Sequence, residues 1–298
     1  MTRAAQPIFR GSLVALPTPF QDGSIDYRAF RRLVERQIQG GSDGLVVAGT
    51  TGEAATLSAT ERTALFEYAA GTVHRRVPVI AGVGSSDTKV ACELAKGAES
   101  TGADALLVST PPYNRPTQEG LRRHFGAIAS ASSLPLCLYN IPSRTGVDLL
   151  PSTVARIQEE NPSVVAIKES ATSLARLKEL VELERLNVLA GEDSWIADAM
   201  QLGAQGVVGV VANLVPKEVS RLVHSFDGED EPAEAPQIVE FLAPLVTALF
   251  LESNPAPLKA ALARLGLCRE DLRLPLVAVS DGTRAKIESA LAAAQLLG

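Results

Sequence analysis

Residues 164–170 read Val164-Val165-Ala166-Ile167-Lys168-Glu169-Ser170, an apolar run that ends in a lysine. A short, continuous apolar run is typical of a strand that is buried on both faces of a parallel sheet. The run ends at Lys168, which would lie at the mouth of the core. A free lysine titrates near ~10.4, and burial can lower that pKa by roughly 3–5 units, as a Schiff-base lysine requires. The alternative is a structural lysine that reaches the surface or pairs with Glu169.

Short apolar runs recur along the chain, and segments with helix-start signals lie between them. The eight runs are residues 12–16, 44–48, 77–83, 103–109, 134–139, 164–168, 187–190 and 206–211. Ser58-Ala59-Thr60-Glu61 is a capping-box pattern that predicts a helix over residues 63–73. Asp26, Thr117, Pro151 and Pro216 are the corresponding start signals for helices over residues 27–39, 118–129, 152–160 and 216–226.

Eight strand–helix units of roughly 28 residues each favour a (β/α)8 TIM barrel over an open doubly wound sheet. An open sheet that binds a dinucleotide needs a glycine-rich loop after its first strand, and residues 16–20 read Leu-Pro-Thr-Pro-Phe instead. Residues 227–234 form an acidic, proline-containing connector, after which only helical periodicity remains. We therefore expect a barrel over residues 1–226 and a small C-terminal helical subdomain over residues 227–298.

Composition narrows the class of function. A net charge of -6 over 298 residues does not favour nucleic acid or an anionic membrane as a partner. The three cysteines are far apart and fit no metal spacing, so we expect reduced thiols in a cytoplasmic protein. The N-terminus lacks the apolar core of a signal peptide, and no stretch approaches the ~18 apolar residues of a membrane span.

Polar residues gather where the predicted strands end, which in a barrel of this type is the face that carries the active site. Gly49-Thr50-Thr51-Gly52-Glu53 follows the second strand, and Tyr113 lies in the loop after the fourth. Tyr139 and Arg144 follow the fifth strand, and Lys168 ends the sixth. Taken singly, Thr50 and Thr51 could serve only to form the turn, Tyr113 could anchor its loop, and Arg144 could form a surface ion pair. Together they supply an amine, a phenol, hydroxyls and a guanidinium on one rim, which favours catalysis.

Four sequence motifs are Gly49–Glu53, Tyr139-Asn140-Ile141-Pro142, Ile167-Lys168-Glu169 and Gly206-Val207-Val208-Gly209-Val210. Together they resemble motifs of the pyruvate-dependent class I aldolases, the family that includes dihydrodipicolinate synthase and N-acetylneuraminate lyase. The similarity extends from residues 11–20 to the tail Asn254-Pro255-Ala256-Pro257-Leu258-Lys259. Within the family, Arg144 and the loop over residues 111–116 look like those of the synthases.

The resemblance implies that Lys168 forms a Schiff base with pyruvate, whose carboxylate is held by Thr51 and nearby backbone N–H groups. It implies a proton relay through Tyr139, Thr50 and Tyr113. Arg144 would hold L-aspartate 4-semialdehyde, and the product would be 4-hydroxy-tetrahydrodipicolinate, an intermediate of lysine and diaminopimelate biosynthesis. Gly49, Gly191 and Val208 would line the pocket. No metal or organic cofactor is implied, and the expected assembly is a homotetramer of two tight dimers with Tyr113 crossing the dimer interface.

One departure from the family pattern concerns regulation. Many similar bacterial synthases bind L-lysine through histidines, an asparagine, a glutamate and a second tyrosine. The matching positions here are Ala59, Arg62, Ser86, Val90 and Pro112. These side chains cannot make the same polar contacts, so we expect insensitivity to L-lysine.

Two other functions stay open from the sequence. One is a pyruvate aldolase of the same family that acts on N-acetylneuraminate or a 2-keto-3-deoxy sugar acid. Arg144 argues against this function. The other is a catalytically silent binding protein on the same scaffold, and the presence of Lys168, Tyr113 and Tyr139 argues against that.

Overall fold

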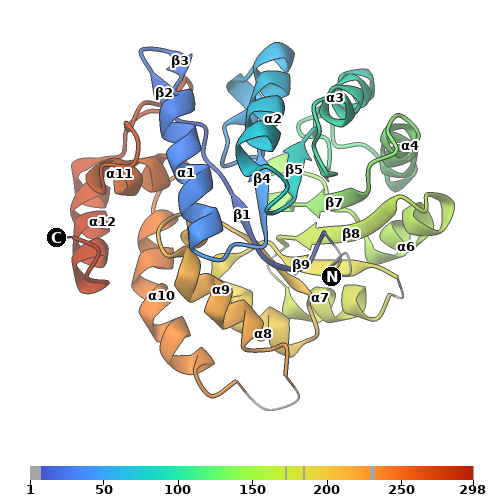
Figure 1. Cartoon of the computed structure of the whole chain (residues 1–298). Helices are drawn as coiled ribbons and strands as arrows, with labels where there is room; N and C mark the ends of the chain where they lie inside the picture. The colour runs from blue at the N-terminus through green and yellow to red at the C-terminus, as the bar shows by residue number, and fades with distance from the viewer. Residues whose placement is uncertain (1–7, 172, 184, 229–231, 298) are drawn as a thin grey trace.

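Eight parallel strands close into a barrel in the computed structural model, which describes residues 8–171, 173–183, 185–228 and 232–297 (Figure 1). The strands are β1 (Gly11–Ala15), β4 (Gly44–Val47), β5 (Val79–Gly82), β6 (Ala105–Ser109), β7 (Leu136–Asn140), β8 (Val164–Glu169), β9 (Asn187–Ala190) and β10 (Gly206–Gly209). Each strand pairs with its neighbours along the chain, and β10 closes the barrel on β1 with Gly11 opposite Gly206. The predicted (β/α)8 barrel is confirmed.

A helix follows each barrel strand, and these helices form a ring around the sheet (Figure 1). They are α1 (Tyr27–Gln39), α2 (Ala59–Val73), α3 (Thr88–Ser100), α4 (Gln118–Ala129), α6 (Pro151–Glu160), α7 (Leu174–Val181), α8 (Ile196–Gln201) and α9 (Pro216–His224). The predicted capping box is present, because the Ser58 hydroxyl accepts from the Glu61 N–H and the Glu61 carboxylate accepts from the Ser58 N–H. Asp26 and Thr117 also cap their helices as predicted.

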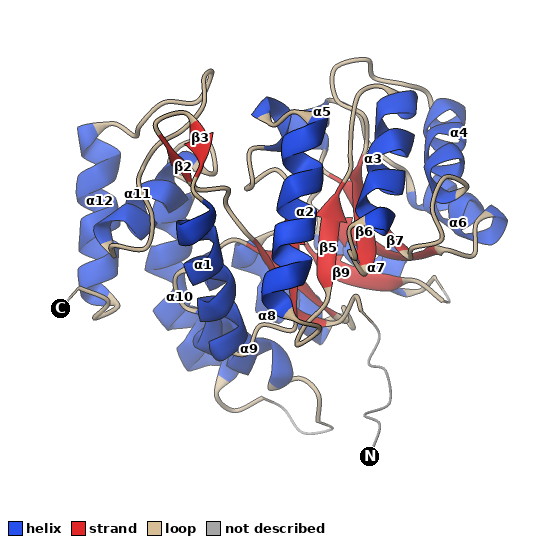
Figure 2. Cartoon of the chain, turned by 45° about the horizontal axis from the view of Figure 1, so that its top comes forward, coloured by secondary structure: helices blue, strands red, loops and turns tan. Residues whose placement is uncertain are grey.

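Two small elements lie in the loops at the mouth of the barrel. A hairpin of β2 (Phe20–Gln21) and β3 (Ser24–Ile25) follows β1, and the one-turn helix α5 (Pro142–Thr145) follows β7. Neither is long enough to show the periodicity on which sequence prediction depends. Figure 2 shows the hairpin beside α11 (Ala256–Arg264).

Strand alternation separates the interior of the barrel from the layer under the helices. On β8, Ala166 belongs to the apolar cluster inside the barrel, and Ile167 belongs to the larger cluster between sheet and helices. Two residues further on, Lys168 therefore points into the barrel and Glu169 points out of it. The alternation places a lysine side chain in an apolar interior.

The C-terminal helices α10 (Ala235–Leu249), α11 and α12 (Asp281–Ala293) lie together on one side of the barrel (Figures 1 and 2). α10 packs on α9, and α12 packs on both α10 and α11. The predicted acidic connector includes residues 229–231, which lie outside the described residues, so the division at residue 226 stays a prediction. Among the described helices, none has the length and apolar character needed to cross a membrane.

Candidate active site

The centre of the candidate site is Lys168, whose side chain is buried at the end of β8. The residue is only 6% exposed, and its Nζ atom lies 4.2 Å from the centroid of the Tyr139 ring. The two residues are register partners in the β7–β8 ladder. Their proximity therefore follows from strand pairing, and the amine faces a phenol ring rather than solvent.

Glu169 does not pair with Lys168, although it is the next residue along the strand. Its fully buried carboxylate accepts from Arg176 Nε at 3.0 Å, from Asn140 Nδ2 at 3.0 Å and from the Ala171 N–H at 2.6 Å. Burial raises the pKa of Glu169, and the charge of Arg176 opposes that rise. The structural alternative, in which Lys168 reaches the surface or pairs with Glu169, is not what the structure shows.

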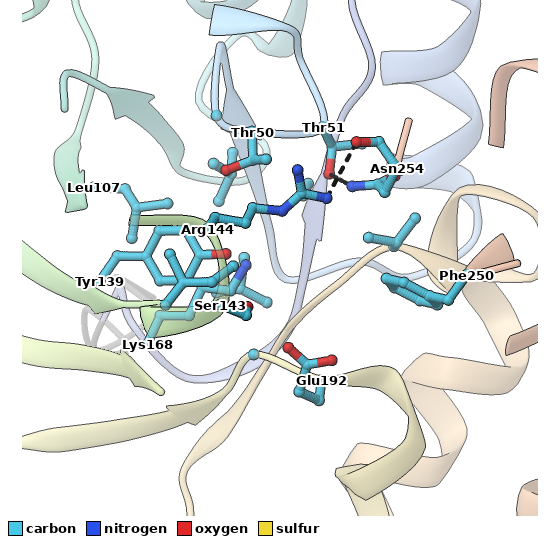
Figure 3. Close-up of a pocket in the computed structure, with 17 residues that line it drawn as sticks. Thr50, Thr51, Leu107, Tyr139, Ser143, Arg144, Lys168, Glu192, Phe250 and Asn254 are labelled. Carbon is cyan, nitrogen blue, oxygen red and sulfur yellow. Dashed lines mark hydrogen bonds between the residues drawn. The ribbon is translucent and has the colours of Figure 1, made fainter. Parts of the chain in front are cut away.

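A cavity of about 160 Å³ opens above Lys168 at the carboxyl ends of the strands (Figure 3). Eight of the nine site residues expected from the sequence line it, namely Gly49, Thr50, Thr51, Tyr139, Arg144, Lys168, Gly191 and Val208. Five different strand ends supply them, as is usual for active sites in this fold. Their roles in a reaction remain predictions.

The turn after β4 forms one wall of the cavity. The Glu53 N–H donates to the Thr50 carbonyl at 3.0 Å, and the Ala54 N–H donates to the Gly49 carbonyl at 3.2 Å. Thr51 is 2% exposed, and its Oγ1 accepts from Asn254 Nδ2 at 3.0 Å. A tight turn that carries hydroxyls and backbone N–H groups is suited to hold a small carboxylate.

Arg144 reaches over the cavity from α5 and is anchored from the C-terminal region. Its Nη2 donates to the Asn254 carbonyl at 3.3 Å, so the main chain of Asn254 contacts Arg144 while the side chain contacts Thr51 (Figure 3). The guanidinium lies between Thr50 and Thr51 on one side and Tyr139 and Lys168 on the other in this view. A carboxylate bound by Arg144 would therefore lie close to the lysine amine.

Tyr113 is the expected site residue that the cavity does not include. Its side chain is 92% exposed, and its backbone takes a positive φ of 76° while its N–H donates to the Thr145 carbonyl at 3.3 Å. A single chain therefore does not bring the Tyr113 phenol to Tyr139 and Thr50. The predicted three-residue proton relay is incomplete within one chain.

Three polar residues of the cavity were not expected from the sequence, namely Ser143, Glu192 and Asn254. Glu192 directly follows Gly191 at the end of β9, so the rule that strand ends carry the site could have found it. Burial raises the pKa of Glu192, and the charges of Lys168 and Arg144 oppose the rise. Asn254 comes from the C-terminal region, where no strand end points to it.

Gly191 is required because side chains crowd its position. A Cβ atom there would lie 1.9 Å from Ser170 Oγ, 2.8 Å from the Glu169 carbonyl oxygen and 3.0 Å from Lys168 Cε. Any larger residue would displace the lysine or the backbone beside it. The glycine therefore allows β8 and β9 to approach closely at the floor of the cavity.

Asp193 supports the part of the cavity wall that Val208 and Val210 form. Its carboxylate is buried and accepts from the Val210 N–H at 2.9 Å and from the Val211 N–H at 3.1 Å. Burial raises the pKa of Asp193 to about 6, and these two hydrogen bonds oppose the rise. A Cβ atom on Gly209 would lie 2.2 Å from Asp193 Oδ1, which explains the glycine in the motif after Val208.

A second cavity of about 580 Å³ adjoins the first and shares Gly49, Thr50, Tyr139 and Arg144 with it. It extends past Arg62, Ser86 and Pro112, three of the positions that the sequence resemblance matched to a lysine-inhibitor site. Arg62 donates to the Gly84 carbonyl at 3.2 Å and to the Ala54 carbonyl at 2.5 Å. Its guanidinium thus braces the wall of this cavity.

A closed parallel barrel in which a buried lysine lies among a phenol, hydroxyls and a guanidinium at the strand ends is the arrangement of one enzyme class, the lysine-dependent class I aldolases. Comparison with known proteins narrows this class. A model of the dihydrodipicolinate synthetase family matches residues 8–294. The 4-hydroxy-tetrahydrodipicolinate synthase of Pelobacter propionicus is 48% identical over 282 residues, which cover 94% of this chain and 97% of the relative. The chain belongs to the dihydrodipicolinate synthetase family.

Solved structures agree with this assignment. A chloride-inhibited dihydrodipicolinate synthase from Acinetobacter baumannii, complexed with pyruvate, superposes with a TM-score of 0.94 at 41% identity and covers 97% of this chain and 100% of the relative. A structure described as the first monomeric dihydrodipicolinate synthase variant superposes with a TM-score of 0.94 at 38% identity, over 97% of this chain and 98% of the relative. The barrel and the C-terminal helices are therefore shared with the family.

Proposed function

We propose that this chain condenses pyruvate with L-aspartate 4-semialdehyde to give 4-hydroxy-tetrahydrodipicolinate, through a Schiff base on Lys168. The observation that carries the proposal is the buried Lys168 amine at the floor of a small cavity, with Tyr139 against it and Arg144 above it. A relative of this family has been solved with pyruvate, and curated relatives carry the name of this synthase. We place the reaction in the cytoplasm.

The first half of the reaction uses the floor of the cavity. The Lys168 amine adds to the ketone carbon of pyruvate, water leaves, and a protonated imine forms. The imine accepts the electron pair of a methyl C–H bond, which gives an enamine and releases a proton. Thr51 and the N–H groups of its turn would hold the pyruvate carboxylate during these steps. Tyr139 would carry the protons, because a phenol both donates and accepts.

The second half uses the upper part of the cavity. The enamine carbon attacks the aldehyde of the second substrate, whose carboxylate Arg144 would hold by a charge-assisted, bidentate contact. The aldehyde oxygen takes up a proton and becomes the hydroxyl of the product. The amine of the substrate then attacks the imine carbon, closes the ring and expels Lys168 as a free amine.

The relay through Tyr113 needs a second copy of the chain. The phenol is 92% exposed and lies outside the cavity, so we propose that it enters the site of a neighbouring subunit. Leu274 and Val277 are also exposed apolar residues, at 79% and 64%. Association of two copies would bury such side chains, and we propose a homotetramer built from two tight dimers. The description of one relative as the first monomeric variant fits a family in which association is usual.

The first test is a coupled assay in which a reductase consumes the product and oxidises a nicotinamide. Turnover with pyruvate and L-aspartate 4-semialdehyde is expected for the wild-type protein and for Lys178→Ala, which removes a different lysine on α7. Lys168→Ala should show no turnover and no borohydride-trapped pyruvate adduct. Adduct formation without turnover would contradict the synthase and direct attention to N-acetylneuraminate or 2-keto-3-deoxy sugar acids. Absence of any adduct on the wild-type protein would contradict lysine catalysis altogether and favour a silent binding protein.

A further inference from the structure

The tail motif over residues 254–259 has no part in the reaction described so far, yet it meets the active-site turn. Asn254 precedes α11, and its Nδ2 donates to Thr51 Oγ1 at 3.0 Å. Lys259 lies on α11 and forms an ion pair with Glu53, the last residue of the same turn. Two residues of one short segment thus contact the Gly49–Glu53 turn in its middle and at its end.

The Lys259–Glu53 ion pair is inside the protein. The Lys259 and Glu53 side chains are 0% and 1% exposed. Lys259 Nζ also donates to the Asp271 carbonyl at 2.8 Å and lies 4.2 Å from the centroid of the Phe20 ring in β2. Burial lowers the pKa of Lys259, and the charge of Glu53 opposes this shift. The cation is held by three different parts of the chain, and it has no contact with the cavity.

Glu53 transmits this contact to the turn. Its backbone has a φ of 54°, in the left-handed region, and its N–H closes the turn on the Thr50 carbonyl at 3.0 Å. The second carboxylate oxygen accepts from the Arg273 N–H at 3.2 Å. The C-terminal region therefore contacts both carboxylate oxygens of Glu53. Because Glu53 is the last residue of the turn that carries Thr50 and Thr51, these contacts fix the end of that turn.

Stability alone does not account for this arrangement. Replacing a buried ion pair by apolar residues of similar volume is often neutral or stabilising, because two charges must be desolvated to form the pair. An ion pair does, however, restrict the relative positions of its two side chains, because its attraction and hydrogen bonds are satisfied in few geometries. Catalysis needs groups held in position in this way, because a displacement of about 1 Å at a reacting group can reduce the rate about 100-fold.

We propose that residues 254–259 form a clamp that positions the active-site turn, with Asn254 orienting the Thr51 hydroxyl and Lys259 fixing the turn through Glu53. Asn254 and Lys259 are positioning residues: Lys259 acts through Glu53, and Asn254 acts through Thr51. The inference rests on the proposed function in one respect, namely that this turn holds the pyruvate carboxylate. It assigns residues 254–259 an indirect part in pyruvate binding, through the position of the turn.

The test measures the pyruvate concentration that gives half-maximal borohydride trapping on Lys168. Asn254→Ala removes the side-chain contact to Thr51 and keeps the carbonyl that Arg144 contacts. Lys259→Met removes the cation, and the double variant Glu53→Gln/Lys259→Met also removes the unpaired buried carboxylate. We expect the half-saturating pyruvate concentration to rise about 10- to 100-fold in all three, since misplacement of a binding group has costs of this order. Maximal trapping at saturating pyruvate should change much less.

Thermal unfolding separates positioning from stability. The double variant should regain much of the melting temperature that Lys259→Met loses, because no buried charge is left unpaired. Its half-saturating pyruvate concentration should nevertheless stay high. Ile287→Val, a buried substitution on α12, is the matched control and should lower the melting temperature without changing pyruvate binding.

The possible outcomes are distinct. If the wild-type protein traps pyruvate and the folded variants bind it as the wild type does, the clamp is wrong and the proposed function stands. If pyruvate binding recovers in the double variant together with stability, the pair is only structural and the clamp is again wrong. If Lys259→Met does not fold, Asn254→Ala and the double variant decide the matter. If the wild-type protein traps no pyruvate, the proposed function itself fails and the clamp fails with it.

Discussion

At the scale of single residues, the alternation of β8 assigns opposite environments to two neighbours. Lys168 points into the barrel against Tyr139, and Glu169 points into the helix layer, where Arg176 pairs with it. A shift of one residue in the register would exchange these environments and leave a carboxylate where the reaction needs an amine. The chemistry of the site thus depends on strand register as much as on residue type.

Arg144 gives a residue-scale prediction about the second substrate. Arg144→Ala should raise the half-saturating concentration of L-aspartate 4-semialdehyde about 10- to 100-fold, because hydrogen bonds to charged groups contribute about 1.5–3 kcal/mol. Pyruvate trapping on Lys168 should change little. Arg156→Ala, at an exposed position of α6, is the matched control in steady-state kinetics. An equal loss of affinity for both substrates would show that Arg144 does not discriminate between them.

A second residue-scale prediction concerns L-lysine. Ser86 and Val90 carry none of the imidazole, amide, carboxylate or phenol groups expected of a lysine-inhibitor site, and Arg62 already donates to two carbonyl groups in the second cavity. We therefore expect turnover at fixed substrate concentrations to be unchanged when L-lysine is titrated into the coupled assay. A dose-dependent fall in turnover, with the coupling reductase shown to be unaffected, would contradict this expectation.

At the scale of elements, the barrel face opposite the active site holds a charged cluster at the end of α9. His224 Nδ1 lies 2.7 Å from an Asp227 oxygen, and Nε2 lies 2.9 Å from Asp43 Oδ2. Asp43 Oδ2 also accepts from the Ser12 N–H of β1, and Arg10 pairs with Asp227 at 3.0 Å. The hydrogen bond to Asp43 raises the pKa of His224 to about 9, with a smaller contribution from Asp227 and opposition from burial.

This cluster predicts a pH dependence of stability. Because the folded-state pKa of His224 lies above its ordinary value of 6.5, the contribution is complete below about pH 6.5 and is lost as the pH rises through about 9. His224→Asn should therefore lower the melting temperature near pH 6, and the difference from the wild type should disappear near pH 10. His74→Asn, at the exposed end of α2, is the control. A difference that stayed constant across this range would contradict the charge-based account.

For the whole molecule, Tyr113 is an expected site residue that lies outside the cavity of its own chain. Its phenol is 92% exposed, so Tyr113→Phe should change stability by no more than about 0.5 kcal/mol. If the phenol serves a neighbouring subunit, turnover should fall far more than stability does. Melting temperature and steady-state turnover of the same preparation provide the comparison.

Mixing two inactive variants tests the shared site directly. Lys168→Ala and Tyr113→Phe chains, unfolded and refolded together, should recover about a quarter of wild-type activity, because half of the two-fold dimers are mixed and each has one intact site. The matched control mixes Lys168→Ala with Arg144→Ala, which lie in one cavity of one chain and should show no recovery beyond the Arg144→Ala chain alone. Equal recovery in both mixtures, or none in either, would show that Tyr113 does not act across subunits.

The barrel could be predicted from the amino-acid sequence, because eight buried parallel strands and their capped helices each carry a local pattern. The sequence also predicted that one rim carries Lys168, Tyr139 and the turn at residues 49–53, since the carboxyl ends of parallel strands meet at one face. The contacts of Asn254 and Lys259 with this turn follow, in contrast, from tertiary packing alone. Those contacts join residues about 200 positions apart, and no periodicity or turn signal encodes which distant side chains a folded core brings together.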